Sequence, residues 1–220
     1  MATSTTITHD YDTLVREELA DLRAFLDTLT DEQWDGPTLC EGWRVRDVIG
    51  HMCVGYSINL LTFPFTLATF GFNVPKGSHV LSVRYGDEHT PAEIKANFAA
   101  LTTKEKPGGL ARVIKTHERF TDHLIHQQDI RRPMNKPREI PRERLVAALD
   151  ALPRIGGFLK SNQKAKGLRF VATDIDYTLG DGPEVRGPAE SLILAISGRP
   201  VALPELEGEG LATLRERVGA

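Results

Sequence analysis

Apolar residues close to the N-terminus recur with the 3.6-residue period of an amphipathic helix. The apolar stripe consists of Leu14, Val15, Leu19, Leu22, Phe25, Leu26 and Leu29. Glu18 alone interrupts it. The pattern predicts a helix from about Tyr11 to Leu29 with one face buried against other helices.

Further helices are predicted from the same period and from start and stop signals. A second helix begins near Val45 and ends before Pro64, because proline cannot donate a helical hydrogen bond. Residues 63–89 contain several glycines and are expected to form a loop. The sequence of residues 90–93 is typical of a capping box, so a third helix should run from there to about Leu101.

The C-terminal half changes in character along its length. A fourth helix is expected over residues 110–131, and another helical segment opens at Pro141. Residues 168–172 alternate like a strand, and residues 184–186 follow a glycine-rich turn as a candidate return strand. A helix starting at Pro188 comes next.

These elements predict a mainly α fold, in which an up-and-down four-helix bundle precedes a small C-terminal α/β appendage. We expect the bundle to span residues 1–160 and the appendage residues 161–220. No flexible linker separates the two parts, so we expect the appendage to be packed on the bundle.

Composition places the chain among soluble globular proteins, with 220 residues of which 40% are hydrophobic and 26% charged. The formal net charge of −3 provides no basic surface for a nucleic-acid partner. Two cysteines make no disulfide framework, and the polar N-terminal residues do not resemble a secretory signal. We therefore expect a cytoplasmic protein.

One segment, from Met52 to Pro75, contains no charged residue and is long enough to cross a bilayer. It also contains several threonines and asparagines, and Pro64 lies within it. These residues favour a buried helix that runs into an apolar loop, with no membrane partner.

Two residues of the fourth predicted helix are candidates for metal binding. Asp122 and His126 are four residues apart, so their side chains project from the same helix face. A carboxylate and an imidazole on adjacent turns can chelate one divalent metal, most readily zinc, with a third ligand from another helix. His51 of the second helix is a candidate for that ligand, although nearby His117 and His123 leave the ligand set open.

Helical periodicity also supports a different interpretation of these residues. The apolar positions of this region fill an arc of about 140°, and they are Val113, Ile114, Phe120, Leu124 and Ile125. Asp122, His126 and Asp129 lie outside the arc, as residues of a solvent-exposed face would.

Three blocks of the sequence carry a family resemblance. They are residues 34–51 (WDGPTLCEGWRVRDVIGH), residues 122–133 (DHLIHQQDIRRP) and residues 181–200, which begin DGPEVRGPAE and end SGRP. In this order they resemble the mycothiol-dependent maleylpyruvate isomerase family of the DinB-like superfamily.

The resemblance implies a DinB-like four-helix bundle that binds a divalent metal through His51, Asp122 and His126. Relatives often have a glutamate or histidine at the acidic position, and Asp122 has a shorter reach. The face that periodicity assigns to solvent would then point into the bundle. The implied chemistry is activation of mycothiol, or a similar small thiol, as a thiolate that attacks an electrophile. Addition alone makes a transferase, whereas addition, rotation and elimination make an isomerase.

The remaining site predictions concern substrate binding. Arg199 is predicted to be catalytic and Arg186 to bind the polar body of the thiol, if the C-terminal segment folds over the bundle mouth; Arg199 could instead cap its helix. Four aromatic residues after the second helix favour an apolar electrophile, namely Phe63, Phe65, Phe70 and Phe72.

Two other functions use the same residues. A metal-dependent amide hydrolase would activate water in place of a thiol. A zinc-binding scaffold or sensor would close the site with a fourth protein ligand, for which Cys40 and Cys53 are the candidates. The sequence leaves a monomer and a homodimer equally open.

Overall fold

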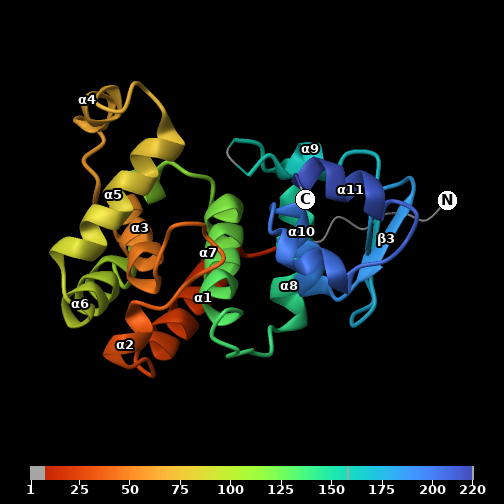
Figure 1. The fold of residues 1–220 in the computed structure, drawn as a ribbon, viewed down its shortest axis with the longest axis horizontal. Coiled ribbons are helices and arrows are strands. Elements are labelled where there is room, and N and C mark those ends of the chain that lie inside the picture. Colours follow the sequence, from red (N-terminus) through yellow and green to blue (C-terminus); the bar gives the residue numbers. More distant parts are fainter. Residues whose placement is uncertain (1–7, 158, 220) are drawn as a thin grey trace.

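The computed structural model describes residues 8–157 and 159–219, so the polar stretch up to residue 7 lies outside the described residues. Its N-terminal half is built around α1 (Tyr11–Leu26), α3 (Val45–Ser57), α6 (Pro91–Thr102) and α7 (Thr116–Arg131). Helix α1 packs against α7 and α3 packs against α6, as Figure 1 shows. The short helix α2 (Asp31–Trp34) joins α1 to α3.

The prediction of a loop over residues 63–89 is wrong. The structure has α4 (Phe63–Ala68) and the long helix α5 (Val74–Glu88) there. One of the glycines that suggested a loop serves close packing instead: a Cβ atom on Gly86 would lie 2.2 Å from Oδ1 of Asp47 in α3. Gly50 of α3 is packed as closely, with 3.0 Å between its would-be Cβ and the Ser82 carbonyl oxygen. Small residues on both helices thus let α3 and α5 approach each other.

The fourth predicted helix begins later than expected. A 3₁₀ turn, η1 (Gly109–Arg112), precedes α7, which starts at Thr116. Val113 and Ile114 lie between the two and are exposed. They therefore do not belong to the apolar face of α7.

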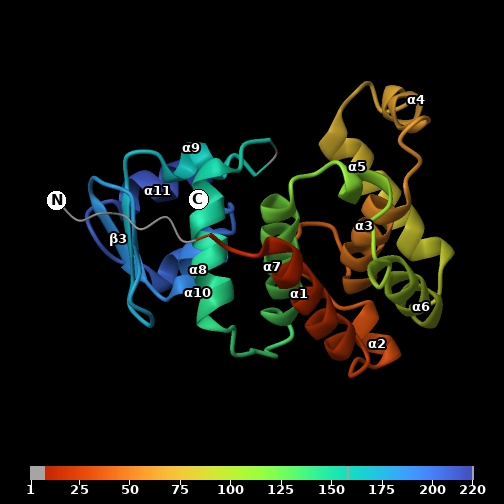
Figure 2. The same cartoon turned by 180° about the vertical axis from the view of Figure 1, so that it is seen from behind.

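The C-terminal part consists of short elements grouped around α8 (Arg142–Ala151) and α10 (Ala189–Ile196), which are in contact. Helix α8 also packs on α7, so it joins the two ends of the molecule seen in Figure 2. The other elements are η2 (Leu152–Arg154), α9 (Ser161–Ala165), η3 (Pro200–Glu205) and α11 (Leu211–Val218).

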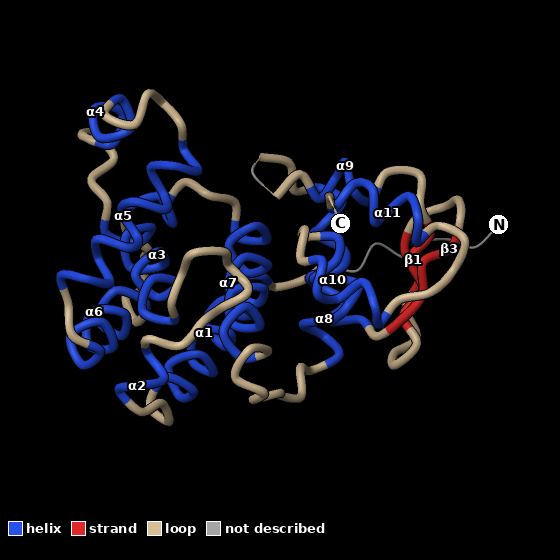
Figure 3. Tube along the Cα trace, in the orientation of Figure 1, coloured by secondary structure: helices blue, strands red, loops and turns tan. Residues whose placement is uncertain are grey.

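A three-stranded sheet lies at the far end of this part, as Figure 3 shows. Its strands are β1 (Arg169–Ala172), β2 (Thr178–Leu179) and β3 (Glu184–Gly187), in the order β2-β1-β3. The predicted return strand is present, but it pairs with β1 in parallel. The antiparallel neighbour is β2, because the chain reverses once before β2 and again after it.

None of the helices in the described part of the chain is both long and apolar enough to cross a membrane.

Glu18, the polar interruption in the apolar stripe of α1, lies at the junction of the two parts. It is fully buried. Its carboxylate accepts hydrogen bonds from Gln127 of α7 (2.7 Å), from Arg144 of α8 (3.2 Å) and from Arg138. A buried carboxylate with these partners stabilises the junction only while all of them are present.

We expect Glu18→Gln to lower the free energy of unfolding by about 3–5 kcal/mol, because it leaves two largely buried guanidinium groups without their shared carboxylate. Glu17→Gln is the matched control. Glu17 also pairs with Arg144, but its side chain is 49% exposed, so its loss should cost less than about 1 kcal/mol. Urea denaturation of both variants measures the difference, and equal small losses would contradict the role of Glu18.

Candidate metal centre

The structure brings His51, Asp122 and His126 together between α3 and α7. One ligand atom from each residue lies within 4.8 Å of the others. Oδ1 of Asp122 is 3.5 Å from Nε2 of His126. The rings of His51 and His126 are 5.2 Å apart and nearly perpendicular. Two imidazoles and a carboxylate at this spacing fit a divalent metal such as zinc and leave a coordination position free.

His51 is held in place by α5. Its Nδ1 atom lies 3.1 Å from the hydroxyl oxygen of Ser78. This contact leaves Nε2 as the nitrogen available to a metal. Partners of this kind on the second nitrogen orient histidine ligands in metal sites.

His126 is held in the same way, by a carboxylate. Its Nδ1 lies 2.9 Å from Oδ2 of Asp129, which is fully buried one turn further along α7. Arg199 donates to both oxygens of Asp129, from Nε at 3.0 Å and from Nη2 at 2.7 Å. A chain of contacts therefore runs from Arg199 through Asp129 to His126, leaving Nε2 of His126 directed at Asp122.

The two histidines have opposite proton affinities. Burial, followed by repulsion from His126, lowers the pKa of His51 to about 4. Burial also acts to lower the pKa of His126, but attraction to Asp122 and the hydrogen bond to Asp129 raise it well above its usual value. Although burial opposes it, His126 in turn holds the pKa of Asp122 well below its usual range. Without a metal, both ring nitrogens of His126 are therefore protonated and its imidazole is positively charged, whereas His51 is neutral.

These positions resolve the two interpretations of α7. Asp129 is fully buried and His126 is 7% exposed. The side chain of Asp122 is 39% exposed, so it borders the opening of the site. The solvent-exposed interpretation is therefore wrong for His126 and Asp129, because a second packing surface, made by the loop before α3 and by the C-terminal part, covers this face of α7.

Trp43, in the loop before α3, forms an aromatic wall beside the candidate ligands. Its ring lies 5.1 Å from that of His51 and 6.4 Å from that of His126. Its indole N–H donates to Nδ1 of His79 on α5 at 2.7 Å. This wall limits access to the two imidazoles from the side of the loop.

The comparisons with known proteins bear on this site and on the fold. Residues 15–104 match the family described as the mycothiol maleylpyruvate isomerase N-terminal domain. The match includes His51, and it confirms the resemblance seen in the sequence motifs.

Two solved structures resemble the whole fold. They are the mycothiol-dependent maleylpyruvate isomerase and a histidine-to-alanine variant of it, each with 15% sequence identity and a TM-score of 0.59. In both cases the match covers 95% of this chain and 96% of the other. No curated protein matches the sequence. The predicted fold class, mainly α with a small C-terminal α/β part, is thereby confirmed.

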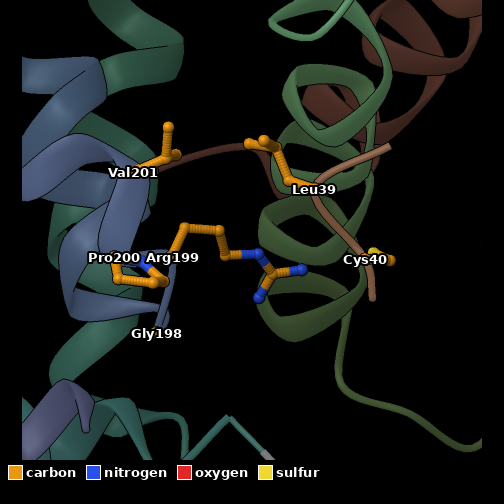
Figure 4. Close-up of a pocket in the computed structure, with 6 residues that line it drawn as sticks. All are labelled: Leu39, Cys40, Gly198, Arg199, Pro200 and Val201. Atoms are coloured by element: carbon orange, nitrogen blue, oxygen red, sulfur yellow. The ribbon is translucent and has the colours of Figure 1, made fainter. Parts of the chain in front are cut away.

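A cavity of about 230 Å³ lies between the loop before α3 and the C-terminal part. It is lined by Leu39, Cys40, Gly198, Arg199, Pro200 and Val201. In Figure 4 the guanidinium of Arg199 extends from the C-terminal part towards α7 and the loop that carries Cys40. The N–H groups of Arg199 are used by Asp129 and by the carbonyl oxygen of Ser197.

The other predicted residues lie elsewhere. Arg186 is on β3, where it pairs with Glu207 at 3.4 Å, and the sheet is at the opposite end of the molecule from α3 (Figure 3). Sγ of Cys40 lies 3.9 Å from Nδ1 of His126, on the ring side away from Asp122, and donates to Asp129 at 3.2 Å. Cys53 is buried within α3. The structure thus gives Arg186 no contact with the cluster.

Sequence reasoning missed the residues that hold the candidate ligands. Ser78 lies in a segment that was expected to be a loop, so no helix face was assigned to it. Asp129 is part of the second motif, three residues after His126, and this spacing is the only sequence signal for its role. Trp43 is part of the first motif, but its ring contacts with histidines of two helices cannot be inferred from spacing.

We expect one divalent metal per chain in the wild-type protein and a severe loss of occupancy in His126→Ala, because the two remaining ligands leave the ion mostly to water. His117→Ala is the matched control, since His117 is on the same helix and outside the donor cluster. Elemental analysis after dialysis measures occupancy. Full occupancy of His126→Ala would show that the ligand assignment is wrong.

Metal binding should also depend on pH. The raised pKa of His126 means that the metal must displace its proton, so affinity should fall as the pH falls, by about tenfold per pH unit for one proton. His51, with a pKa of about 4, adds no further proton release near neutral pH. Calorimetric titrations in buffers of different ionisation enthalpy count the released protons. An affinity that does not change between pH 6 and 8 would contradict a protonated His126.

Proposed function

We propose that this protein is a thiol-dependent isomerase or S-transferase that uses a divalent metal, most readily zinc, and mycothiol or a similar small thiol. The observation that carries the proposal is the meeting of His51, Asp122 and His126, with His51 and His126 each fixed through their second nitrogen. The family of residues 15–104 and the similarity to a mycothiol-dependent enzyme support the same chemistry.

The site supports a role in thiol activation because it is open to a further ligand. A bound divalent metal with a free position acidifies a coordinating thiol, whose ordinary pKa is about 8.5. Cys40 does not close the site, because its sulfur is on the Nδ1 side of His126. Asp122 lies at the opening of the site, and His126 lies deeper. An incoming thiol can therefore reach the free coordination position of a bound metal from the side of Asp122.

In this proposal Arg199 acts through Asp129. Its two N–H contacts fix the Asp129 carboxylate against His126. Although burial opposes it, the hydrogen bond to His126 and these contacts with Arg199 hold the pKa of Asp129 well below its usual range. Because these contacts use its guanidinium, we assign Arg199 a positioning role within the site. Binding of the polar body of the thiol by Arg186 stays a prediction from the sequence alone, because Arg186 lies on β3 and does not contact the cluster. Only a raised KM for thiol in Arg186→Gln would support it.

An apolar electrophile fits the lobe formed by α4 and the start of α5. Phe70 packs against Gly77, the residue before Ser78, so the lobe is next to the residue that holds His51. Phe65 and Phe72 are 76% and 67% exposed. Exposed aromatic side chains beside a site favour an apolar ligand.

The deciding experiment mixes zinc-loaded protein with mycothiol and two electrophiles, an aryl halide and a conjugated cis-alkene. Loss of one thiol per molecule of electrophile identifies a transferase. Conversion of the cis-alkene to the trans form without net loss of thiol identifies an isomerase, because elimination returns the thiol. Metal-free protein is the control, and glutathione and bacillithiol test which thiol is preferred.

Other outcomes of the same experiment would replace the proposal. Hydrolysis of an amide in the absence of thiol would favour the hydrolase. No reaction of either kind, together with a cysteine ligand in the zinc site, would favour the scaffold or sensor.

We expect Arg199→Gln to lower kcat or metal affinity by about 10–100-fold, the usual effect of losing a partner of a metal ligand. Arg215→Gln, which changes an exposed arginine on α11, should leave both unchanged. Steady-state kinetics and zinc titrations of the two variants make the comparison, and a normal Arg199→Gln enzyme would rule out the chain from Arg199 to His126.

A further inference from the structure

Tyr56 of α3 and His123 of α7 form a buried pair beside the candidate ligands. The hydroxyl oxygen of Tyr56 lies 2.9 Å from Nε2 of His123, and the two rings stack at 5.8 Å. Tyr56 is 5% exposed and His123 is 4% exposed. Neither residue supplies a donor to the three-residue cluster.

The other nitrogen of His123 has no partner. Among the described residues, nothing forms a hydrogen bond with its buried Nδ1 atom. Such an atom destabilises the fold, so buried polar atoms without partners are uncommon and often functional. Oδ2 of Asp122 is 3.7 Å away, slightly beyond hydrogen-bond distance.

A hydrogen bond donated by the Tyr56 hydroxyl would fix which nitrogen of His123 carries the proton. Burial raises the pKa of Tyr56 to about 12, so the hydroxyl keeps its proton and can donate it to Nε2. A neutral imidazole that accepts a hydrogen bond at Nε2 has its proton on Nδ1. The donor of His123 is therefore on the side of Asp122.

We propose that His123, with its tautomer fixed by Tyr56, is a positioning residue that orients the Asp122 carboxylate towards the metal. This inference rests on the metal centre of the proposed function. A donor at Oδ2 leaves Oδ1, which is 3.5 Å from Nε2 of His126, as the ligand atom. Carboxylate ligands are commonly held in this way by a second hydrogen bond. Asp122 needs this second hydrogen bond because its side chain is short. Its carboxylate can therefore reach the ion in only one orientation.

The test compares two amide substitutions of the same histidine. Asparagine places its amide nitrogen close to the position of Nδ1, whereas glutamine places it close to Nε2. We expect His123→Asn to bind zinc within about threefold of the wild type and His123→Gln to bind it about 10–100-fold more weakly. Competition with a chromophoric chelator measures affinity, and thermal melting of the metal-free proteins shows whether the fold is unchanged.

Tyrosine variants provide an independent arm. Tyr56→Phe keeps the ring and removes the hydroxyl, so the tautomer of His123 is no longer fixed and zinc affinity should fall by about tenfold. Tyr85→Phe is the matched control. Its hydroxyl accepts a hydrogen bond from Asn97 at 2.9 Å, away from Asp122, and its loss should not change zinc affinity.

Equal affinities of the asparagine and glutamine variants would overturn the inference, whether both are normal or both are weak. The first result means that His123 only packs, and the second means that it binds the metal directly or that its ring is needed. If neither variant folds, an unchanged affinity of Tyr56→Phe overturns it. Zinc binding by the wild type without any thiol reaction would refute the proposed function and leave this inference standing.

Discussion

The buried carboxylate of Asp129 is the contact on which the arrangement of the site depends. Its side chain receives hydrogen bonds from Cys40 and Arg199 and lies 2.9 Å from Nδ1 of His126. Its backbone carbonyl accepts from the N–H of Leu39 at 2.9 Å. One residue of α7 thus fixes the loop before α3, the C-terminal part and a candidate metal ligand. An isolated carboxylate at this depth would be very costly, and three donors offset that cost only when all are present.

The charges around Asp129 also set the protonation state of the site when no metal is bound. Two carboxylates, Asp122 and Asp129, flank one imidazole, and Arg199 balances the inner of them. His126 is therefore charged while His51 is neutral. The candidate ligand atoms are already close together without an ion, and the additional proton on His126 places a positive charge among them. Affinity for the ion and the protonation of His126 are consequently linked.

Close contact between α3 and α5 is the second constraint. Gly86 and Gly50 remove side-chain volume where the two helices meet, and the resulting proximity places Ser78 against His51. Larger residues at these positions would move α5 outward and release His51 from its partner. The glycines that would normally mark a loop are in this case what permits helix packing.

The sequence by itself determined the helical class, because the apolar periods of α1 and α3 are clear and α6 begins with a capping box. Through the family motifs it also predicted His51, Asp122 and His126 as a ligand set, and the structure brings these three residues together. Tertiary structure alone decided that α5 is a helix, that β3 pairs in parallel, and that His126 and Asp129 are buried. It also decided which residues contact the candidate ligands, such as Ser78 and Asp129. Periodicity shows which face of a single helix is apolar. The features that it missed depend on which other segment covers the opposite face, and such contacts join residues far apart in the chain.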